Sequence, residues 1–185
     1  MATAVGVKRS TFVQRLVGAS MLNAATYEEL EADPRATMQA LVVVLLSSVS
    51  AGLGARGFGA HGMSTIGFFA IVALMAWVAW SVVIYQVGVR LLPSADTRTD
   101  VGELLRTIGF ATAPGILRVF GIVPRLTTAV MIITAVWMLA AMIVAVRQAL
   151  DYGTTRRAVL VCVLGWVFAV AFVFLFGLLF APRLS

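Results

Sequence analysis

The chain has 185 residues, of which 61% are hydrophobic and only 12% are charged. Its mean hydropathy of +1.01 does not fit a soluble domain, which is usually about 45–50% apolar and about 25% charged. This composition predicts an all-α integral membrane protein. One cysteine and one histidine exclude a disulfide within the chain, a cysteine–histidine metal cluster and a haem held by two histidines. We therefore expect no metal and no cofactor.

Basic residues exceed acidic ones in a pattern that indicates membrane orientation. Lys and Arg number 14 against 8 acids, which gives a formal net charge of +6. A nucleic-acid site gathers its basic residues on one face, whereas here they stand singly at the ends of apolar runs. We therefore expect the lipid bilayer as a partner and no nucleic acid.

Residues 1–33 are expected to form a cytoplasmic N-terminal segment that contains an amphipathic helix. Over residues 11–24 the apolar side chains recur every three to four residues, which is the period of a helix with one apolar face. This helix would either lie in the membrane interface, with Lys8, Arg9 and Arg15 near an anionic leaflet, or pack on the protein's own cytoplasmic face.

Two short motifs predict helix starts. Thr26 followed three residues later by Glu29 predicts a capping box. Asp33 before Pro34 predicts an N-cap followed by proline at the first helical position. The second motif begins the transmembrane domain, residues 34–185. We expect no cleavable signal peptide, because charged residues interrupt residues 10–40.

Five apolar stretches predict five transmembrane helices in one bundle. Their approximate bounds are 38–55, 64–92, 104–123, 127–146 and 158–180. The loops between them are short, so consecutive spans should pack as antiparallel neighbours. The third span is the weakest, because Gly109, Pro114, Gly115 and Arg118 interrupt it. We expect this span to be kinked or broken around Pro114.

Pro114 and Arg118 each allow a structural and a functional interpretation. Proline removes one helical hydrogen bond and frees the carbonyl of Phe110. The resulting break would line a cavity or form an ordinary kink that a neighbouring helix satisfies. Arg118 is the only charge expected at membrane depth. Its side chain would simply snorkel toward lipid phosphate, or would make a functional contact with a lipid phosphate or with a partner's carboxylate.

The basic residues predict a cytoplasmic N-terminus and an outside C-terminus. With the N-terminus inside, ten basic residues fall on the cytoplasmic side and four on the outside. The ten are Lys8, Arg9, Arg15, Arg35, Arg90, Arg98, Arg106, Arg147, Arg156 and Arg157, and the four are Arg56, Arg118, Arg125 and Arg183. All eight acids also fall inside, so the cytoplasmic face is the polar one.

Two polar clusters, at residues 96–106 and 147–157, are expected on this cytoplasmic face. Because both belong to short loops on one side, we expect Glu103 or Asp100 to meet Arg147 or Arg156. Asp151 lies in the second cluster and is a further candidate for contact with a partner or with lipid. The simpler alternative is that these residues only solvate the loops and set the orientation. An exposed pair would contribute only about 0–1 kcal/mol.

The same two clusters carry a family resemblance. The run Glu103–Ala111 with Pro114 and Pro124, and the run Arg147–Tyr152 after Trp137, resemble the bacterial branch of the Yip family of Ypt/Rab-interacting membrane proteins. The resemblance implies five spans and a cytoplasmic N-terminus. Eukaryotic members bind small GTPases. Their Asp-Leu-x-Gly-Pro motif does not occur in this sequence and their long soluble N-terminal region is absent, so a small GTPase is not an expected partner.

The sequence predicts a non-enzymatic protein of the bacterial inner membrane that assembles with itself or with other membrane proteins and organises or shapes the bilayer. The cores of the spans hold no Asp, Glu, Lys or His, which argues against an ion-coupled carrier and an intramembrane hydrolase. Two alternatives stay open. One is a small transport or permeation module lined by the broken third span, and the other is an accessory subunit of a larger energy-transducing complex.

Overall fold

The computed structural model describes residues 10–58, 63–93 and 98–180, and within these ranges the chain is helical and has no strand. Lys8, Arg9 and Arg183, which enter the orientation count, lie outside the described residues. In chain order the elements are α1 (Phe12–Ser20), α2 (Ala24–Ala32), α3 (Ala36–Gly54), the 3₁₀ turn η1 (Ala55–Phe58), α4 (Met63–Tyr85), the π-helical η2 (Gln86–Leu91), α5 (Val101–Phe110), the 3₁₀ helix η3 (Ala113–Ile122), α6 (Thr127–Ala149) and α7 (Thr155–Phe180).

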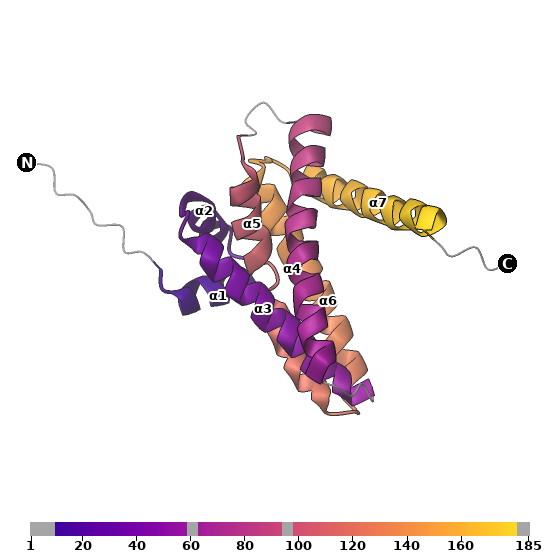
Figure 1. The fold of residues 1–185 in the computed structure, drawn as a ribbon. Coiled ribbons are helices and arrows are strands. Elements are labelled where there is room, and N and C mark those ends of the chain that lie inside the picture. Colours follow the sequence, from indigo (N-terminus) through magenta and orange to yellow (C-terminus); the bar gives the residue numbers. More distant parts are fainter. Residues whose placement is uncertain (1–9, 59–62, 94–97, 181–185) are drawn as a thin grey trace, which may run out of the picture.

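The long helices α3, α4 and α6 form a bundle, with α5 and η3 packed against them (Figure 1). Among the described residues, three helical stretches are long and apolar enough to cross a membrane: Ala36–Gly54, Ala73–Leu91 and Thr127–Ala149. We call the end of the bundle where α3 begins and α6 ends the acidic end, because the acidic residues named in the next subsection gather there. These features describe a helical membrane protein.

The segment predicted as the third span consists of two helices of different type. The α-helix α5 ends at Phe110, a turn follows, and the 3₁₀ helix η3 begins at Ala113. Pro114 lies in the first turn of η3, where a missing backbone N–H removes no helical hydrogen bond. The change of helix type therefore occurs at the residues where the sequence predicts an irregularity, and η3 continues between α3 and α6.

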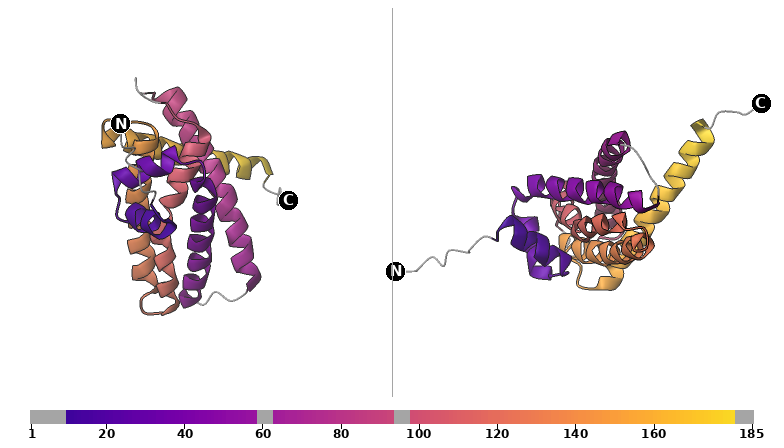
Figure 2. Two further views of the ribbon diagram at one scale, coloured as in Figure 1. Left: turned by 90° about the vertical axis from the view of Figure 1, so that its left-hand side faces the viewer. Right: turned by 90° about the horizontal axis from the view of Figure 1, so that it is seen from below.

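The last helix, α7, does not pack along α6 as the short loop predicts. It contacts α4, η2 and α6 near the acidic end and then runs out of the bundle, across its long axis (Figures 1 and 2). One face of its first half is buried, at Ala158, Val161 and Cys162, whereas the other side is exposed, with Val163 at 52%, Trp166 at 60% and Val170 at 58%. The expected antiparallel pairing of α6 and α7 over their whole length is therefore not present.

Helix starts near the N-terminus differ partly from the predicted ones. Thr11 and Gln14 form the capping box of α1. The capping box predicted for Thr26 and Glu29 is wrong, because the Asn23 side chain caps α2 instead. The physical reason is that Glu29 is engaged elsewhere: its carboxylate accepts hydrogen bonds from the backbone N–H and the hydroxyl of Ser10.

The start of the following helix agrees with the Asp33–Pro34 motif to within two residues. The Asp33 carboxylate accepts a hydrogen bond from the Arg35 N–H, at 3.1 Å, and α3 begins at Ala36. Assigned helix ends commonly vary by that amount. Asp33 thus both ends α2 and satisfies a free N–H at the start of α3.

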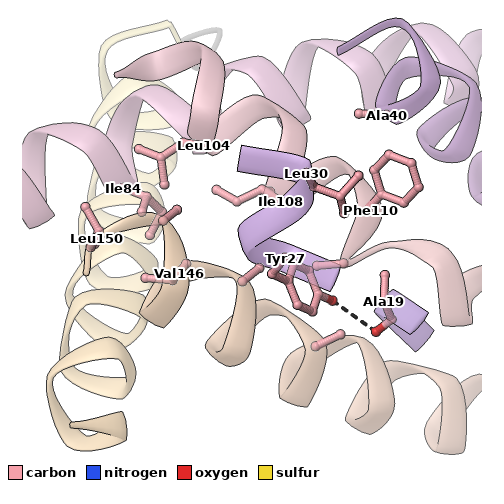
Figure 3. Packing of buried hydrophobic residues seen from close by; sticks show 14 of the residues in the cluster. Ala19, Tyr27, Leu30, Ala40, Ile84, Leu104, Ile108, Phe110, Val146 and Leu150 are labelled. Atoms are coloured by element: carbon pink, nitrogen blue, oxygen red, sulfur yellow. Dashed lines mark hydrogen bonds between the residues drawn. The ribbon is translucent and has the colours of Figure 1, made fainter. Parts of the chain in front are cut away.

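Part of the core lies where the N-terminal helices meet α5 and α6 (Figure 3). Tyr27 and Leu30 of α2 are fully buried, as are Leu104 of α5 and Val146 of α6. The Tyr27 hydroxyl donates to the Ala19 carbonyl at 3.1 Å, so the polar tip of this large buried side chain is satisfied. The core therefore fixes α1 and α2 to the bundle.

Candidate functional site

An open cavity of about 460 Å³ lies at the acidic end, where α2, α5 and the C-terminal end of α6 meet. Each of these elements contributes charged or polar side chains because its polar terminus lies there. The lining residues are Glu28, Glu31, Ala32, Glu103, Arg147, Gln148, Asp151 and Tyr152. Three of the sequence-predicted candidates, Glu103, Arg147 and Asp151, thus belong to one cavity.

Four carboxylates and one guanidinium line this cavity, so its net charge is negative. Burial, together with the nearby carboxylates of Asp151 and Glu103, raises the pKa of Glu31 to about 7, although Arg106 partly opposes the shift. A carboxyl group with this pKa gains or loses its proton near neutral pH. The cavity can therefore accept hydrogen-bond donors or a cationic group, and its charge changes with pH.

Arg106 of α5 is 7% exposed and contacts the backbone of the cavity residue Glu31. Its Nε donates to the Leu30 carbonyl at 3.1 Å and its Nη2 to the Glu31 carbonyl at 2.6 Å. These carbonyls belong to the last turn of α2, where backbone acceptors lack helical partners and a positive charge is favourable. Arg106 therefore holds α2 against α5. From the sequence, this residue is predicted only as an orientation signal.

The expected acidic–basic pairing across the two clusters is not present as a direct ion pair. Asp100 and Glu103 instead form the capping box of α5: each carboxylate accepts the other residue's backbone N–H, at 2.8 and 2.9 Å. Arg147 donates to the Tyr152 carbonyl at 3.2 Å and to the Thr155 hydroxyl at 3.4 Å. Glu103 and Arg147 share a cavity, and each is held within its own cluster.

The turn after α6 is the second half of the site. Asp151 has a left-handed backbone, with φ of 51°, and its exposed side chain lines the cavity. The Tyr152 hydroxyl donates to the Gly88 and Leu92 carbonyls, at 3.1 and 2.7 Å, and thereby ties this turn to the end of η2. Arg156 is exposed in the first turn of α7 and is not among the residues that line the cavity.

Arg118 and Pro114 lie apart from the cavity, in η3. Pro114 is buried at the start of η3, which packs between α3 and α6. Arg118 is half-buried and its Nε donates to the Thr134 hydroxyl of α6 at 3.3 Å. Neither residue lines the cavity. The contact of Arg118 with lipid or with a partner stays a prediction.

Arg15 belongs to a second buried cluster, which sequence reasoning does not identify. It is 2% exposed and forms ion pairs with Glu29 at 2.9 Å and with Asp33 at 2.7 Å. Its Nη1 also donates to the Gln39 side chain at 3.0 Å. The cluster joins α1, α2 and α3.

The geometry does not indicate a metal centre. Among the described residues, no group of three or more His, Cys, Asp or Glu side chains could hold a metal ion. Cys162 is buried on α7 and is remote in sequence from the cavity residues of α2 and α5. The arrangement offers charge recognition at the acidic end and a packed helical interior elsewhere.

Comparison with known proteins gives one match. The family model described as the Yip1 domain matches residues 21–177, which is most of the chain and includes α2, the cavity and nearly all of α7. No curated protein and no solved structure matches significantly.

Proposed function

Because this chain belongs to the Yip1 domain family, we propose that it is a non-enzymatic multi-pass membrane protein that assembles with itself or with other membrane proteins. In this proposal it belongs to the bacterial branch of the family and lies in the inner membrane. Through assembly it organises or shapes the bilayer. Residues 1–33 form the N-terminal segment and residues 34–185 the membrane domain.

The proposal includes five spans with a cytoplasmic N-terminus. The three long apolar stretches supply the first, second and fourth spans. The two-part segment formed by α5 and η3 supplies the third, and α7 supplies the fifth. The distribution of ten against four basic residues supports this orientation. The acidic end then faces the cytoplasm, where the cavity is available to a basic segment of a partner.

The observation that carries the proposal is the exposed apolar surface of α7. This helix leaves its own bundle (Figure 2), and Val163, Trp166 and Val167 on it are 52–60% exposed. Apolar exposure alone is ordinary for a helix in lipid. Only one face of the first half of α7 packs against the chain's own helices, at Val161 and Cys162, so the opposite face is left without the close intramolecular packing that usually drives helix association within membranes. A neighbouring chain supplies that packing in this proposal.

Single-cysteine cross-linking tests assembly through α7. Cys162 is the only cysteine, so Cys162→Ala gives a clean background. In that background, Val167→Cys should form disulfide-linked complexes in native membranes, with itself or with a partner. The matched control is Ile132→Cys on α6, which is 59% exposed and should cross-link only by random collision. Equal, weak cross-linking at both positions would contradict assembly through α7.

A further inference from the structure

Helix α1 has apolar residues on both of its faces and its one charged residue on the inside. Ala19 is fully buried, and Phe12 and Leu16 pack against the core. Arg15 is 2% exposed, whereas Val13 is 62%, Val17 45% and Met21 73% exposed. These three apolar residues are spaced by four, so they form one stripe along the helix. A helix on a water-exposed protein surface normally carries charged and polar residues on its outer face, and only its inner face is apolar.

The inward polar groups of α1 are satisfied within the protein. The Arg15 guanidinium donates to Glu29, Asp33 and Gln39, so it needs neither water nor lipid phosphate. On the outer face, the side-chain oxygen of Gln14 accepts the Thr11 N–H at 2.8 Å, so this exposed polar residue also has a partner within the N-terminal segment. Such internal pairing is what allows a helix with a charged residue to lie in a medium of low dielectric constant.

The C-terminal end of α1 lies beside the middle of α6. The Trp137 Nε1 of α6 donates to the Ser20 carbonyl at 2.7 Å. Trp137 is ten residues from the first residue of α6 and twelve from the last, or about 15 and 18 Å along the helix. Two perpendicular views also place α1, in dark indigo, beside the middle of the bundle (Figures 1 and 2).

From the level of Trp137, halfway along α6, the chain returns through α2 to the acidic end. The Gln148 amide of α6 donates to the Glu28 carboxylate at 2.9 Å, which is eleven residues beyond Trp137, or about 16 Å. At its other end α1 packs against the third predicted span, with the rings of Phe12 and Phe110 6.3 Å apart and edge to face. Contacts at both ends therefore fix α1 below the acidic end.

Exposed apolar residues also occur on α6 near Trp137, the residue that contacts the end of α1. Ile133 and Val136, next to Trp137 on α6, are 60% and 63% exposed. Because α6 is long and apolar enough to cross a membrane, its exposed residues at mid-length would face acyl chains. A hydrocarbon core is about 30 Å thick, so the middle of α6 and the end of α1 share its central region.

We propose that α1 is submerged in the acyl-chain region of the leaflet at the acidic end, with Val13, Val17 and Met21 against lipid chains. The helix thus inserts into one leaflet only and reaches the bilayer centre at Met21. This differs from an interfacial helix, because Arg15 is paired inside the protein and does not contact lipid headgroups. The proposal depends on α6 as a span and is independent of assembly through α7.

Depth-dependent fluorescence quenching tests this location. In the Cys162→Ala background, Val17→Cys and Met21→Cys are labelled with bimane and the full chain is reconstituted into vesicles of phosphatidylcholine and phosphatidylglycerol. Lipids brominated on the acyl chains, or iodide in the buffer, are then added. Ile133→Cys serves as the acyl-facing reference, and Gly153→Cys in the exposed turn after α6 serves as the aqueous reference.

We expect brominated chains to quench labels at positions 17 and 21 as strongly as the label at position 133, and iodide to quench only the label at position 153. Quenching of positions 17 and 21 by iodide would overturn the proposal, because α1 would then face water. Quenching by neither agent would also overturn it, because protein would cover the stripe. Absence of acyl-chain quenching at position 133 would remove α6 as a span and the proposal with it. None of these outcomes depends on cross-linking at α7.

Discussion

Arg15 and Arg106 are buried cations that hold the N-terminal helices to the bundle. Arg15 pairs with Glu29 and Asp33, and Arg106 donates to two carbonyls at the end of α2. A buried charge is tolerated only when it is paired and its donors are used. These two residues therefore determine whether α1 and α2 remain docked.

We predict that Arg15→Ala undocks α1 and α2. The substitution leaves Glu29 and Asp33 without their cation, and removing one member of a buried pair costs about 3–5 kcal/mol. We expect about 3 kcal/mol, because the Glu29 side chain is 30% exposed and water compensates it in part. Hydrogen exchange of the α1 and α2 amides in detergent measures the effect. Arg35→Ala, at an exposed position, is the control, and equal protection in both variants would contradict the prediction.

Glu31 makes docking of α2 depend on pH. Its pKa is about 7 in the docked state, against an ordinary value of 4.5, so the docked state binds the proton more tightly. Docking is therefore fully favourable below about pH 4.5 and weakens as the pH rises toward 7. Because the site is partly exposed, we expect a loss of roughly tenfold in the docking equilibrium across this range. Hydrogen exchange of the α1 and α2 amides measures this loss, and in Glu31→Gln the docking of α2 should not depend on pH in this range. A pH profile of Glu31→Gln equal to that of the wild type would show that another group is responsible.

Neither buried arginine is predictable from the sequence, for a physical reason. In a membrane protein a single Arg at the end of an apolar run has the same local pattern whether it sets orientation or pairs internally. The distinction depends on contacts between distant segments, such as Arg106 with Leu30, which are 76 residues apart. Glu103, Arg147 and Asp151 could be predicted to share a face because short loops fix which side they lie on.

At the scale of helices, close packing of α3 against α5 and η3 depends on small residues. A Cβ added to the glycines of α5 and η3 would contact small residues of α3 at three positions along the helices. The facing pairs are Gly109 with Ala40, Gly115 with Ser47, and Gly121 with Gly54. Successive pairs are seven residues apart on α3 and six residues apart on α5 and η3. At about 1.5 Å per residue in an α-helix and about 2.0 Å in a 3₁₀ helix, these steps are about 10.5 and at most about 12 Å.

The close packing of α3 against α5 and η3 predicts that Gly54→Ala destabilises the fold. A Cβ at Gly54 would overlap the backbone carbonyl of Arg118, and a backbone atom cannot move aside as a side chain can. Alanine normally favours a helix over glycine by about 1 kcal/mol, so a loss of about 1–3 kcal/mol identifies the clash. Thermal unfolding in detergent measures it. Gly153→Ala is the control, because a Cβ at that position would have no atom within 4 Å. Equal stability of both variants would contradict the close packing of α3 at Gly54.

Helices and their approximate ends were predictable, whereas helix type and direction were not. Apolar length identifies α3, α4 and α6, and Pro114 with its flanking glycines marks where α5 gives way to η3. No local pattern distinguishes the 3₁₀ geometry of η3 from an α-helix. Helix α7 follows a turn that contacts a distant segment, through the Tyr152 hydroxyl and the Gly88 and Leu92 carbonyls, and no local pattern encodes such a contact.

At the scale of the whole molecule, the chain is a Yip1 domain membrane protein with an acidic end and a helix that leaves the bundle. The acidic cavity presents charge at one end, α1 presents an apolar stripe below it, and α7 extends sideways. These surfaces face a cytoplasmic partner, lipid chains and a neighbouring membrane protein, respectively, in the proposed arrangement. A protein with three such surfaces is suited to assembly within the bilayer.

Native mass spectrometry of the wild-type chain, released gently from its own membrane with its surrounding lipids, tests assembly most directly. The single chain has a mass of 19.7 kDa. The account predicts a species of higher mass, either a whole-number multiple of the chain or the chain with another membrane protein, which dissociates to the single chain in harsher detergent. A species of one chain with lipid alone, at every protein concentration measured, would contradict it.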